Sequence, residues 1–124
     1  MFQIGDIVSV YGGGEHQVYG IEIGDDGQFM CSVSGYFTNL AADSLHLLRR
    51  PYNHQEYDIG DQIYPIYGHH ADKKTYTVIG VYSQVNIRDY EVQPLYTIKC
   101  ESEDEILYGV PQENLSHTEP FTLF

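Results

Sequence analysis

The chain has 124 residues, with 18 acidic against 6 basic side chains and a formal net charge of −12 at pH 7. This balance excludes binding to nucleic-acid phosphates, which needs clustered Lys and Arg, because the only adjacent basic pairs are Arg49-Arg50 and Lys73-Lys74. A hydrophobic content of 42% excludes a disordered acidic tail, and no apolar run approaches the ~20 residues that a membrane span needs. The composition predicts a soluble, folded protein with a basic partner.

Short strands are predicted along the first 33 residues. The turn residues Gly5-Asp6 precede an apolar strand over residues 7–10, and β-branched and apolar side chains predict a second strand over residues 17–23. Residues 24–27 form a hairpin turn in this interpretation, since Asp and Gly tolerate the positive φ values that such turns require. Alternation with period two predicts a third strand over residues 28–33.

The pattern of the first 50 residues is repeated in the rest of the chain. Because the spacing between matching residues grows from 55 to 70, the second copy carries insertions, chiefly around residues 69–75 and 83–94. The second copy therefore predicts strands over residues 62–66, 75–82 and 95–100. The matches are Ile4-Gly5-Asp6-Ile7-Val8 with Ile59-Gly60-Asp61-Gln62-Ile63, Tyr11-Gly12 with Tyr67-Gly68, Val18-Tyr19-Gly20-Ile21 with Val78-Ile79-Gly80-Val81, Phe29, Cys31 and Val33 with Tyr96, Ile98 and Cys100, and Asp43-Ser44-Leu45 with Glu113-Asn114-Leu115.

Residues 39–48 are the best candidate for a helix, because apolar residues follow an Asn that suits a cap. The aligned stretch of the second copy begins at Val110-Pro111 and is typical of one turn of 3-10 helix before a last short strand. We apply the interpretation from the second copy to both.

Five short strands with one helical turn before the last describe a small SH3-like barrel. The order of a Gly-Asp turn, an alternating apolar strand, a polar loop and hydrophobic-x-Gly-hydrophobic resembles the KOW and Tudor class of SH3-like domains. We therefore predict an all-β chain of two tandem five-stranded barrels packed together, with short 3-10 turns and little or no α-helix. The first barrel covers residues 1–50, and the second covers residues 51–124, with longer loops and an apolar tail from Pro120 to Phe124.

The chain departs from that class where the class binds its ligands. The loop after the first strand is Gly12-Gly13-Gly14-Glu15-His16, whereas the KOW pattern has a basic Gly-Lys loop. The same Gly-rich loop lacks the Gly-Lys-Ser/Thr of a phosphate-binding loop. Peptide-binding SH3 domains use a tryptophan, and this chain has none. Neither nucleic acid nor a Pro-rich ligand is expected.

No spacing in the chain matches a catalytic or metal-binding signature. His69-His70 with Asp72 lacks the paired ligands that a metal site needs. Cys31 and Cys100 alternate with apolar residues and are predicted core residues. Asp6 and Asp61 match each other in the two copies, which predicts a turn-capping role. We predict no enzyme activity, no cofactor and no metal.

Two features indicate protein binding. Residues 1–50 contain 6 acidic and 2 basic side chains, residues 51–124 contain 12 and 4, and much of the excess lies in the turn at residues 101–105. The chain also has 12 tyrosines, a residue type enriched in protein interfaces. The predicted partner-binding residues are Asp89, Glu91, Glu101, Glu103, Asp104, Glu105, Tyr64, Tyr67, Tyr82, Tyr90 and Tyr108.

These observations predict a non-enzymatic acidic module that binds a basic protein surface, with an anionic face that steers association and imitates nucleic-acid phosphates. In size and charge the chain is similar to inhibitors such as phage anti-defence and immunity proteins. One alternative is a docking module of a transcription, translation or virion assembly, and another is an enzyme or small-ligand binder with a site between the barrels near His69, His70 and His117. A third is a methyl-lysine cage of tyrosines with Asp89. The acidic turn alternatively serves only to keep the protein soluble. Two cysteines and no visible secretory signal predict a cytoplasmic protein.

Overall fold

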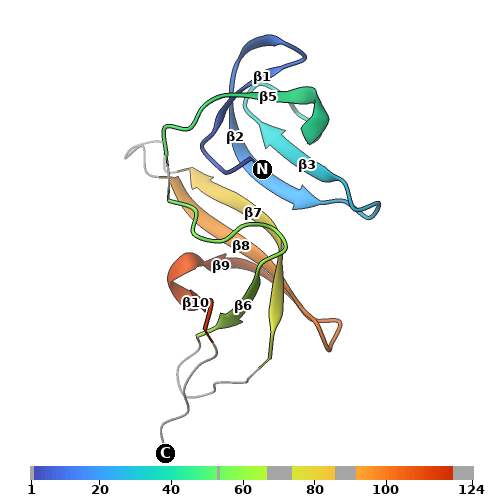
Figure 1. Ribbon diagram of the computed structural model, residues 1–124, viewed down its shortest axis with the longest axis vertical. Coiled ribbons are helices and arrows are strands. Elements are labelled where there is room, and N and C mark those ends of the chain that lie inside the picture. The colour runs from blue at the N-terminus through green and yellow to red at the C-terminus, as the bar shows by residue number, and fades with distance from the viewer. Residues whose placement is uncertain (1, 53, 67–73, 86–91, 119–124) are drawn as a thin grey trace, which may run out of the picture.

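The described part of the chain consists of antiparallel strands, two 3-10 helices and connecting turns (Figure 1). The computed structural model describes residues 2–52, 54–66, 74–85 and 92–118. No α-helix occurs in these ranges, so the predicted all-β class is confirmed. The elements are β1 (Ile7–Val10), β2 (Gly13–Ile23), β3 (Phe29–Val33), β4 (Leu40–Ala41), η1 (Ala42–Ser44), β5 (Leu45–Arg49), β6 (Gln62–Pro65), β7 (Tyr76–Val85), β8 (Val92–Cys100), β9 (Ile106–Pro111), η2 (Gln112–Asn114) and β10 (Leu115–Ser116).

The first half, β1 to β5, and the second half, β6 to β10, repeat one pairing scheme. In the first half the strands pair in the order β5-β1-β2-β3-β4, and in the second half in the order β10-β6-β7-β8-β9. The turns repeat as well: the Gly5 N–H donates to the Val18 carbonyl at 2.7 Å, and the Gly60 N–H donates to the Val78 carbonyl at 2.8 Å. The same pairing scheme thus occurs in both halves, whereas the tandem of two separate barrels stays a prediction.

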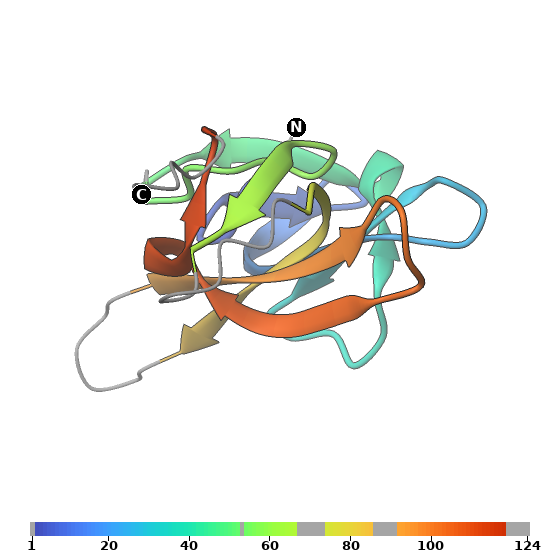
Figure 2. The ribbon, with the colours of Figure 1, turned by 90° about the horizontal axis from the view of Figure 1, so that it is seen from below.

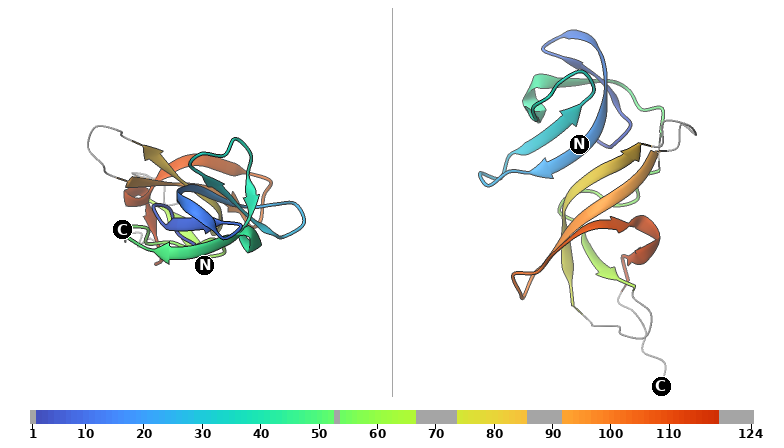
Figure 3. Two further views of the ribbon diagram at one scale, coloured as in Figure 1. Left: turned by 90° about the horizontal axis from the view of Figure 1, so that it is seen from above. Right: turned by 180° about the vertical axis from the view of Figure 1, so that it is seen from behind.

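The two halves meet where β2 pairs with β7 (Figures 1 and 3). Ile21 pairs with Val81, and these two residues are equivalent positions of the two halves. On either side, Gly20 pairs with Tyr82 and Glu22 with Gly80. A pseudo-two-fold axis therefore passes between Ile21 and Val81, and the strand network continues from one half into the other.

The strand pairings correct the sequence alignment of the third strand. Ile21 pairs with Cys31 in the first half, and Val81 pairs with Tyr96 in the second, so Cys31 is equivalent to Tyr96. The predicted match of Cys31 with Ile98 is wrong by two residues. Side chains alternate between the faces of a strand with period two, so a shift of two residues leaves the apolar pattern unchanged.

The corrected register places three insertions of five residues in the second half. The spacing between equivalent residues is 55 in β6, 60 in β7, 65 in β8 and 70 in β9 and β10. The insertions before β7 and before β8 agree with the predicted ones. The third, which sequence analysis missed, lies between β8 and β9 and lengthens that hairpin.

Three local predictions are confirmed and several strand boundaries are corrected: β7 ends at Val85 rather than at Tyr82, and β8 begins at Val92 rather than at Leu95. The hairpin turn at residues 24–27 is present, with the Gly27 N–H donating to the Gly24 carbonyl at 2.9 Å. Residues 39–48 form β4, η1 and most of β5 rather than a helix, as the repeat predicts. Tyr76 and Tyr96 are buried, as expected. The second strand begins at Gly13 rather than at Gln17, because Val10 already pairs with Gly13 across a tight turn.

A single cluster of buried side chains runs through both halves. Val8 and Val33 from the first half and Ile63 and Ile98 from the second are fully buried members. Cys31 and Cys100 are buried free thiols, which confirms their predicted place in the core. Burial, with the nearby charge of Asp6, raises the pKa of Cys31 to about 11, so this thiol stays protonated at neutral pH.

Both Gly-Asp turns are capped by their aspartate, as predicted. Asp6 Oδ2 accepts the Gln3 N–H at 2.8 Å, and Asp61 Oδ2 accepts the Asp58 N–H at 2.9 Å. Asp6 is also fully buried and forms a bidentate ion pair with Arg50, with Nε–Oδ1 at 2.8 Å and Nη2–Oδ2 at 3.0 Å. The turn of the first half is thus tied to the segment that leaves β5.

The two turn glycines supply a matched test of backbone strain and crowding. Gly5 and Gly60 have φ of +88° and +95°, but a Cβ on Gly5 would lie 2.9 Å from Tyr52 Cδ2, whereas a Cβ on Gly60 meets nothing within 4 Å. Gly60→Ala is expected to lower the free energy of unfolding by about 1 kcal/mol through φ strain alone. Gly5→Ala is expected to cost about 1 kcal/mol more, because the Tyr52 side chain must also move. Urea unfolding measures both, and equal losses would contradict the crowding argument.

Candidate functional site

The acidic turn at residues 101–105 forms the tip of the β8–β9 hairpin, which projects from the second half (orange, Figures 1 and 2). Glu101 Oε1 accepts hydrogen bonds from Gln62 Nε2 and from Thr77 Oγ1, both at 3.0 Å. Glu105 Oε1 accepts one from the Tyr76 hydroxyl at 3.1 Å. The carboxylates at the two ends of the turn are therefore held in place by side chains of β6 and β7.

The hydrogen bonds at this hairpin tip do not neutralise most of its negative charge. Gln62, Thr77 and Tyr76 are neutral donors, which orient a carboxylate without cancelling its charge. Among the described residues, Glu103 is the only member of the tip that forms an ion pair, with Lys74 Nζ at 3.1 Å. Asp104 is exposed and has no side-chain partner among the described residues. Burial, with the adjacent Glu105 carboxylate, raises the pKa of Tyr76, so its hydroxyl remains a donor.

The described tyrosines of the predicted surface are spread over three strands. Tyr108 on β9 is 73% exposed, Tyr82 on β7 is partly exposed, and Tyr64 on β6 is half-buried. Tyr82 lies five residues along β7 from Thr77, roughly 17 Å from the acidic turn at the usual rise of a strand. No ring contact joins these three tyrosines within the described ranges. Asp89, Glu91, Tyr67 and Tyr90 lie outside the described residues.

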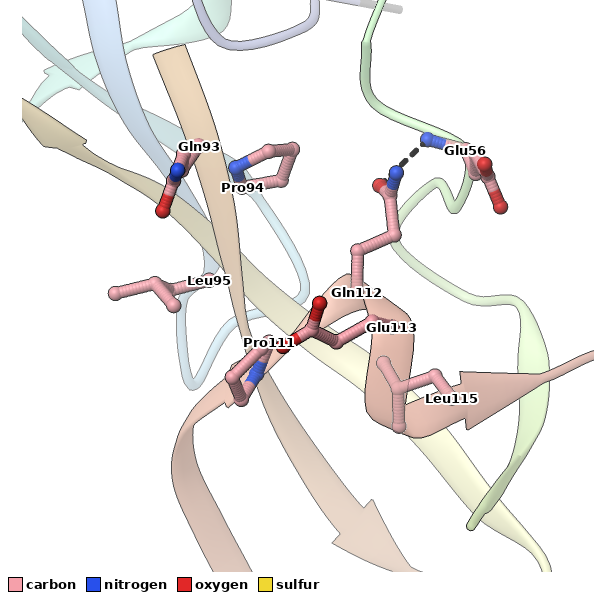
Figure 4. Close-up of a pocket in the computed structure, with 8 residues that line it drawn as sticks. All are labelled: Glu56, Gln93, Pro94, Leu95, Pro111, Gln112, Glu113 and Leu115. Atoms are coloured by element: carbon pink, nitrogen blue, oxygen red, sulfur yellow. Dashed lines mark hydrogen bonds between the residues drawn. The ribbon is translucent and has the colours of Figure 1, made fainter. Parts of the chain in front are cut away.

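A groove of about 550 Å³ opens at the other end of β8 (Figure 4). Of its apolar residues, Leu95 and Pro111 are partly exposed, whereas Pro94 and Leu115 are buried. Sequence reasoning missed this groove, because its lining comes from three segments that are separate in the chain. The lining residues are Glu56, Gln93, Pro94, Leu95, Pro111, Gln112, Glu113 and Leu115.

Gln112 fixes the walls of this groove. Its Oε1 accepts the Glu56 N–H at 2.9 Å and the Tyr96 hydroxyl, and its Nε2 donates to the His54 carbonyl at 2.9 Å. The Tyr57 N–H in turn donates to the Tyr96 hydroxyl at 3.3 Å. One side chain of η2 thus joins the linker, β8 and the core, so the groove is preformed.

A smaller depression of about 130 Å³ lies beside the β2–β7 junction and includes Gly20, Gly80 and Tyr82 in its lining. Three of its polar side chains bond to one another: Ser32 Oγ donates to Asn39 Oδ1 at 2.7 Å, and Asn39 Nδ2 donates to Glu22 Oε1 at 2.6 Å.

The described structure gives no support to the small-ligand site predicted near three histidines. His117 packs its ring on Tyr57, with centroids 4.5 Å apart, and His69 and His70 lie outside the described residues. Within the described ranges, no three His, Cys, Asp or Glu side chains converge as metal ligands would. The same ranges hold no helix with the length and hydropathy needed to cross a membrane.

Comparison with known proteins adds no relative: no family model, no curated protein and no solved structure matches the chain. Its own geometry defines an all-β, internally duplicated acidic protein. Two surfaces of the second half stand out, the acidic tip of the β8–β9 hairpin and the groove between the linker, β8 and η2.

Proposed function

We propose that the protein is a non-enzymatic binding module whose β8–β9 hairpin tip contacts a basic surface of a protein partner. The observation that carries this proposal is the set of neutral donors, Gln62, Thr77 and Tyr76, that orient Glu101 and Glu105 and leave them charged. A carboxylate that is already oriented loses less conformational freedom when it binds. Anionic groups on a projecting tip also steer a basic partner toward it.

The comparison of the two halves supports a specialised hairpin. The hairpin tip belongs to the third five-residue insertion, and the corresponding first-half turn at residues 34–39 contains no acidic residue. Glu101, Glu103 and Asp104 are all exposed, so none of them belongs to the core. The insertion therefore places negative charge on a projecting hairpin that the core does not need, and this supports a role in binding.

The partner is a nucleic-acid-handling or toxin protein in this proposal, and binding inhibits it, because the tip presents carboxylates where nucleic acid would present phosphates. Phage anti-defence proteins and immunity proteins act in this general way. The cytoplasm is the proposed location, which the two free thiols support. A docking role in a transcription, translation or virion assembly uses the same surface, and it differs in leaving the partner active.

Charge reversal at the tip tests the proposal. The tagged chain and its Glu103→Lys/Asp104→Lys variant are each mixed with the heparin-retained proteins of cells that make the protein. We expect the wild type to retain a basic partner with a strong dependence on salt, and the variant to bind it about tenfold more weakly. Retention is measured across salt concentrations, and the activity of the captured partner is measured with and without the wild-type chain.

The matched control is Asp25→Lys/Asp43→Lys, which changes the net charge equally at two exposed positions of the first half. We expect this control to bind like the wild type. Equal losses in both variants would show that only net charge matters, and retention by the tip variant would place the binding surface elsewhere. A captured partner that stays fully active supports the docking role instead of inhibition.

A further inference from the structure

The first half covers its Gly-Asp turn with a segment of its own chain. Arg50, just after β5, donates to the Asp6 carboxylate with Nε–Oδ1 at 2.8 Å and Nη2–Oδ2 at 3.0 Å. Two residues later the Tyr52 ring packs on Gly5, so closely that a Cβ on this glycine would lie 2.9 Å from Cδ2 of the ring. With the Arg-x-Tyr segment of residues 50–52 in this place, Asp6 is fully buried.

The second half builds the same turn with the same bonds. The Val18 N–H donates to the Asp6 carbonyl at 2.9 Å, and the Val78 N–H donates to the Asp61 carbonyl at 3.0 Å. In each turn, Oδ2 of the aspartate accepts the backbone N–H of the residue three positions earlier, at 2.8 Å for Asp6 and 2.9 Å for Asp61. The same anchoring bond thus fixes the Asp61 carboxylate and the carboxylate that binds Arg50.

The second turn lacks the cover that the first one has. Among the described residues, a Cβ on Gly60 would meet nothing within 4 Å, and the partly exposed Asp61 forms no ion pair. The spacing of 70 between β5 and β10 matches Arg50 with Pro120, and residues 119–124 contain neither Arg nor Lys. A cation for Asp61 therefore has to come from another chain.

Two neighbours of this turn favour a basic ligand. Asp58 stands where the first half has Gln3, so the second turn carries one carboxylate more. The residue after Asp61 is Gln62, whose Nε2 donates to Glu101 of the hairpin tip at 3.0 Å. The turn therefore adjoins the acidic tip, and a basic partner at the tip is within reach of Asp61.

We propose that the turn at Gly60 and Asp61 binds an Arg-x-Tyr segment of the basic partner in the way that the first half binds its own residues 50–52. The guanidinium pairs with the Asp61 carboxylate, and the ring packs on Gly60. The proposal rests on the proposed function for the class of partner, and it adds the sequence that this partner presents. We expect Arg rather than Lys, because a planar guanidinium donates two parallel hydrogen bonds to one carboxylate.

The probe is a fluorescein-labelled peptide with the sequence of residues 48–55. The full chain is titrated in, and the dissociation constant is read from fluorescence anisotropy. Two altered peptides, carrying Arg50→Lys or Tyr52→Ala, are expected to bind about tenfold more weakly. Since Arg50→Lys keeps the charge of the peptide, its loss separates recognition by Asp61 from general attraction to an acidic protein.

In the chain, Asp61→Asn is expected to weaken peptide binding about tenfold, because it removes the charge and keeps a side-chain oxygen that can cap the turn. The matched control is Asp43→Asn, which changes the net charge equally at an exposed position of the first half and is expected to bind like the wild type. If Asp61→Asn does not fold, amide shifts of the 15N-labelled wild type decide the matter, and we expect them at Gly60, Asp61 and Gln62.

Four results would overturn the proposal: no peptide binding at millimolar protein, equal affinity for the Arg50→Lys peptide, equal losses for Asp61→Asn and Asp43→Asn, or amide shifts confined to the first half. A chain ending at Thr118 that binds the peptide about tenfold more tightly than the full chain would assign the turn to the protein's own residues 119–124 instead. Peptide binding that fails while the hairpin tip still captures its partner overturns this site alone and leaves the proposed function standing. Peptide binding without capture of any basic partner overturns the proposed function and leaves the turn as a peptide site.

Discussion

Replacing Arg50 with Ala is expected to lower the free energy of unfolding by about 3 kcal/mol. The Asp6 carboxylate is fully buried, and two of its hydrogen bonds come from the Arg50 guanidinium. Without Arg50 a buried negative charge keeps the Gln3 N–H as its remaining described donor. Because the Arg50 side chain is itself 34% exposed, we expect the loss to fall at the low end for buried ion pairs. Urea unfolding at pH 7 measures it.

The neighbouring arginine is the control for this experiment. Arg49 pairs with Glu15 at 2.7 Å, but both side chains are more than half exposed. Exposed pairs are solvated and screened by salt, so Arg49→Ala is expected to leave the unfolding midpoint unchanged. Equal destabilisation by the two substitutions would mean that the loss of positive charge, rather than the buried pair, sets the stability.

Ile98→Ala is expected to lower the free energy of unfolding by about 3 kcal/mol, because it removes a fully buried side chain and leaves a cavity. Val33 is the equivalent residue of the first half and is also fully buried, and Val33→Ala is expected to cost about 2 kcal/mol. Since one core cluster includes both residues, each substitution is expected to shift the same single unfolding transition. Circular dichroism and near-ultraviolet absorbance followed in urea give the two readouts.

Two separate transitions would contradict this expectation. In that case Ile98→Ala would shift only one of them and Val33→Ala only the other. Such a result would show that the β2–β7 pairing does not couple the halves, and it would contradict the prediction that the barrels over residues 1–50 and 51–124 pack together.

The parts of the fold that local chemistry determines could be predicted from the sequence. The Gly-Asp turns require a positive φ and a capping carboxylate, and both appear in the residue types themselves. Repetition of the pattern decided the one ambiguous stretch, residues 39–48, in favour of a 3-10 turn and short strands. Two copies of one pattern carry information that a single apolar run does not.

Strand register could not be predicted in the same way. A shift of two residues in the alignment still matches Cys31 with an apolar residue on the same face of the strand. The strand pairing resolves this ambiguity, because Cys31 pairs with Ile21 and Tyr96 pairs with Val81, the equivalent of Ile21. That error concealed the third insertion and, with it, the reason why the acidic tip projects. The contacts of Glu101 with Gln62 and Thr77 depend on the same long-range pairing.

The groove is beyond sequence reasoning for a related reason. Its lining brings Glu56, Pro94 and Glu113 together from segments up to 57 residues apart, and nothing in their spacing predicts that approach.

The pairing of Ile21 with Val81 has a consequence for how the two halves can differ. Two identical halves joined strand to strand at equivalent residues would form a symmetric dimer, and such a dimer dissociates on dilution. Within one chain the same contact forms at an effective concentration on the order of millimolar. Association then no longer depends on protein concentration, and a substitution in one half is not copied into the other. The first half can keep its compact form while the second half accumulates insertions, acidic residues and an open groove.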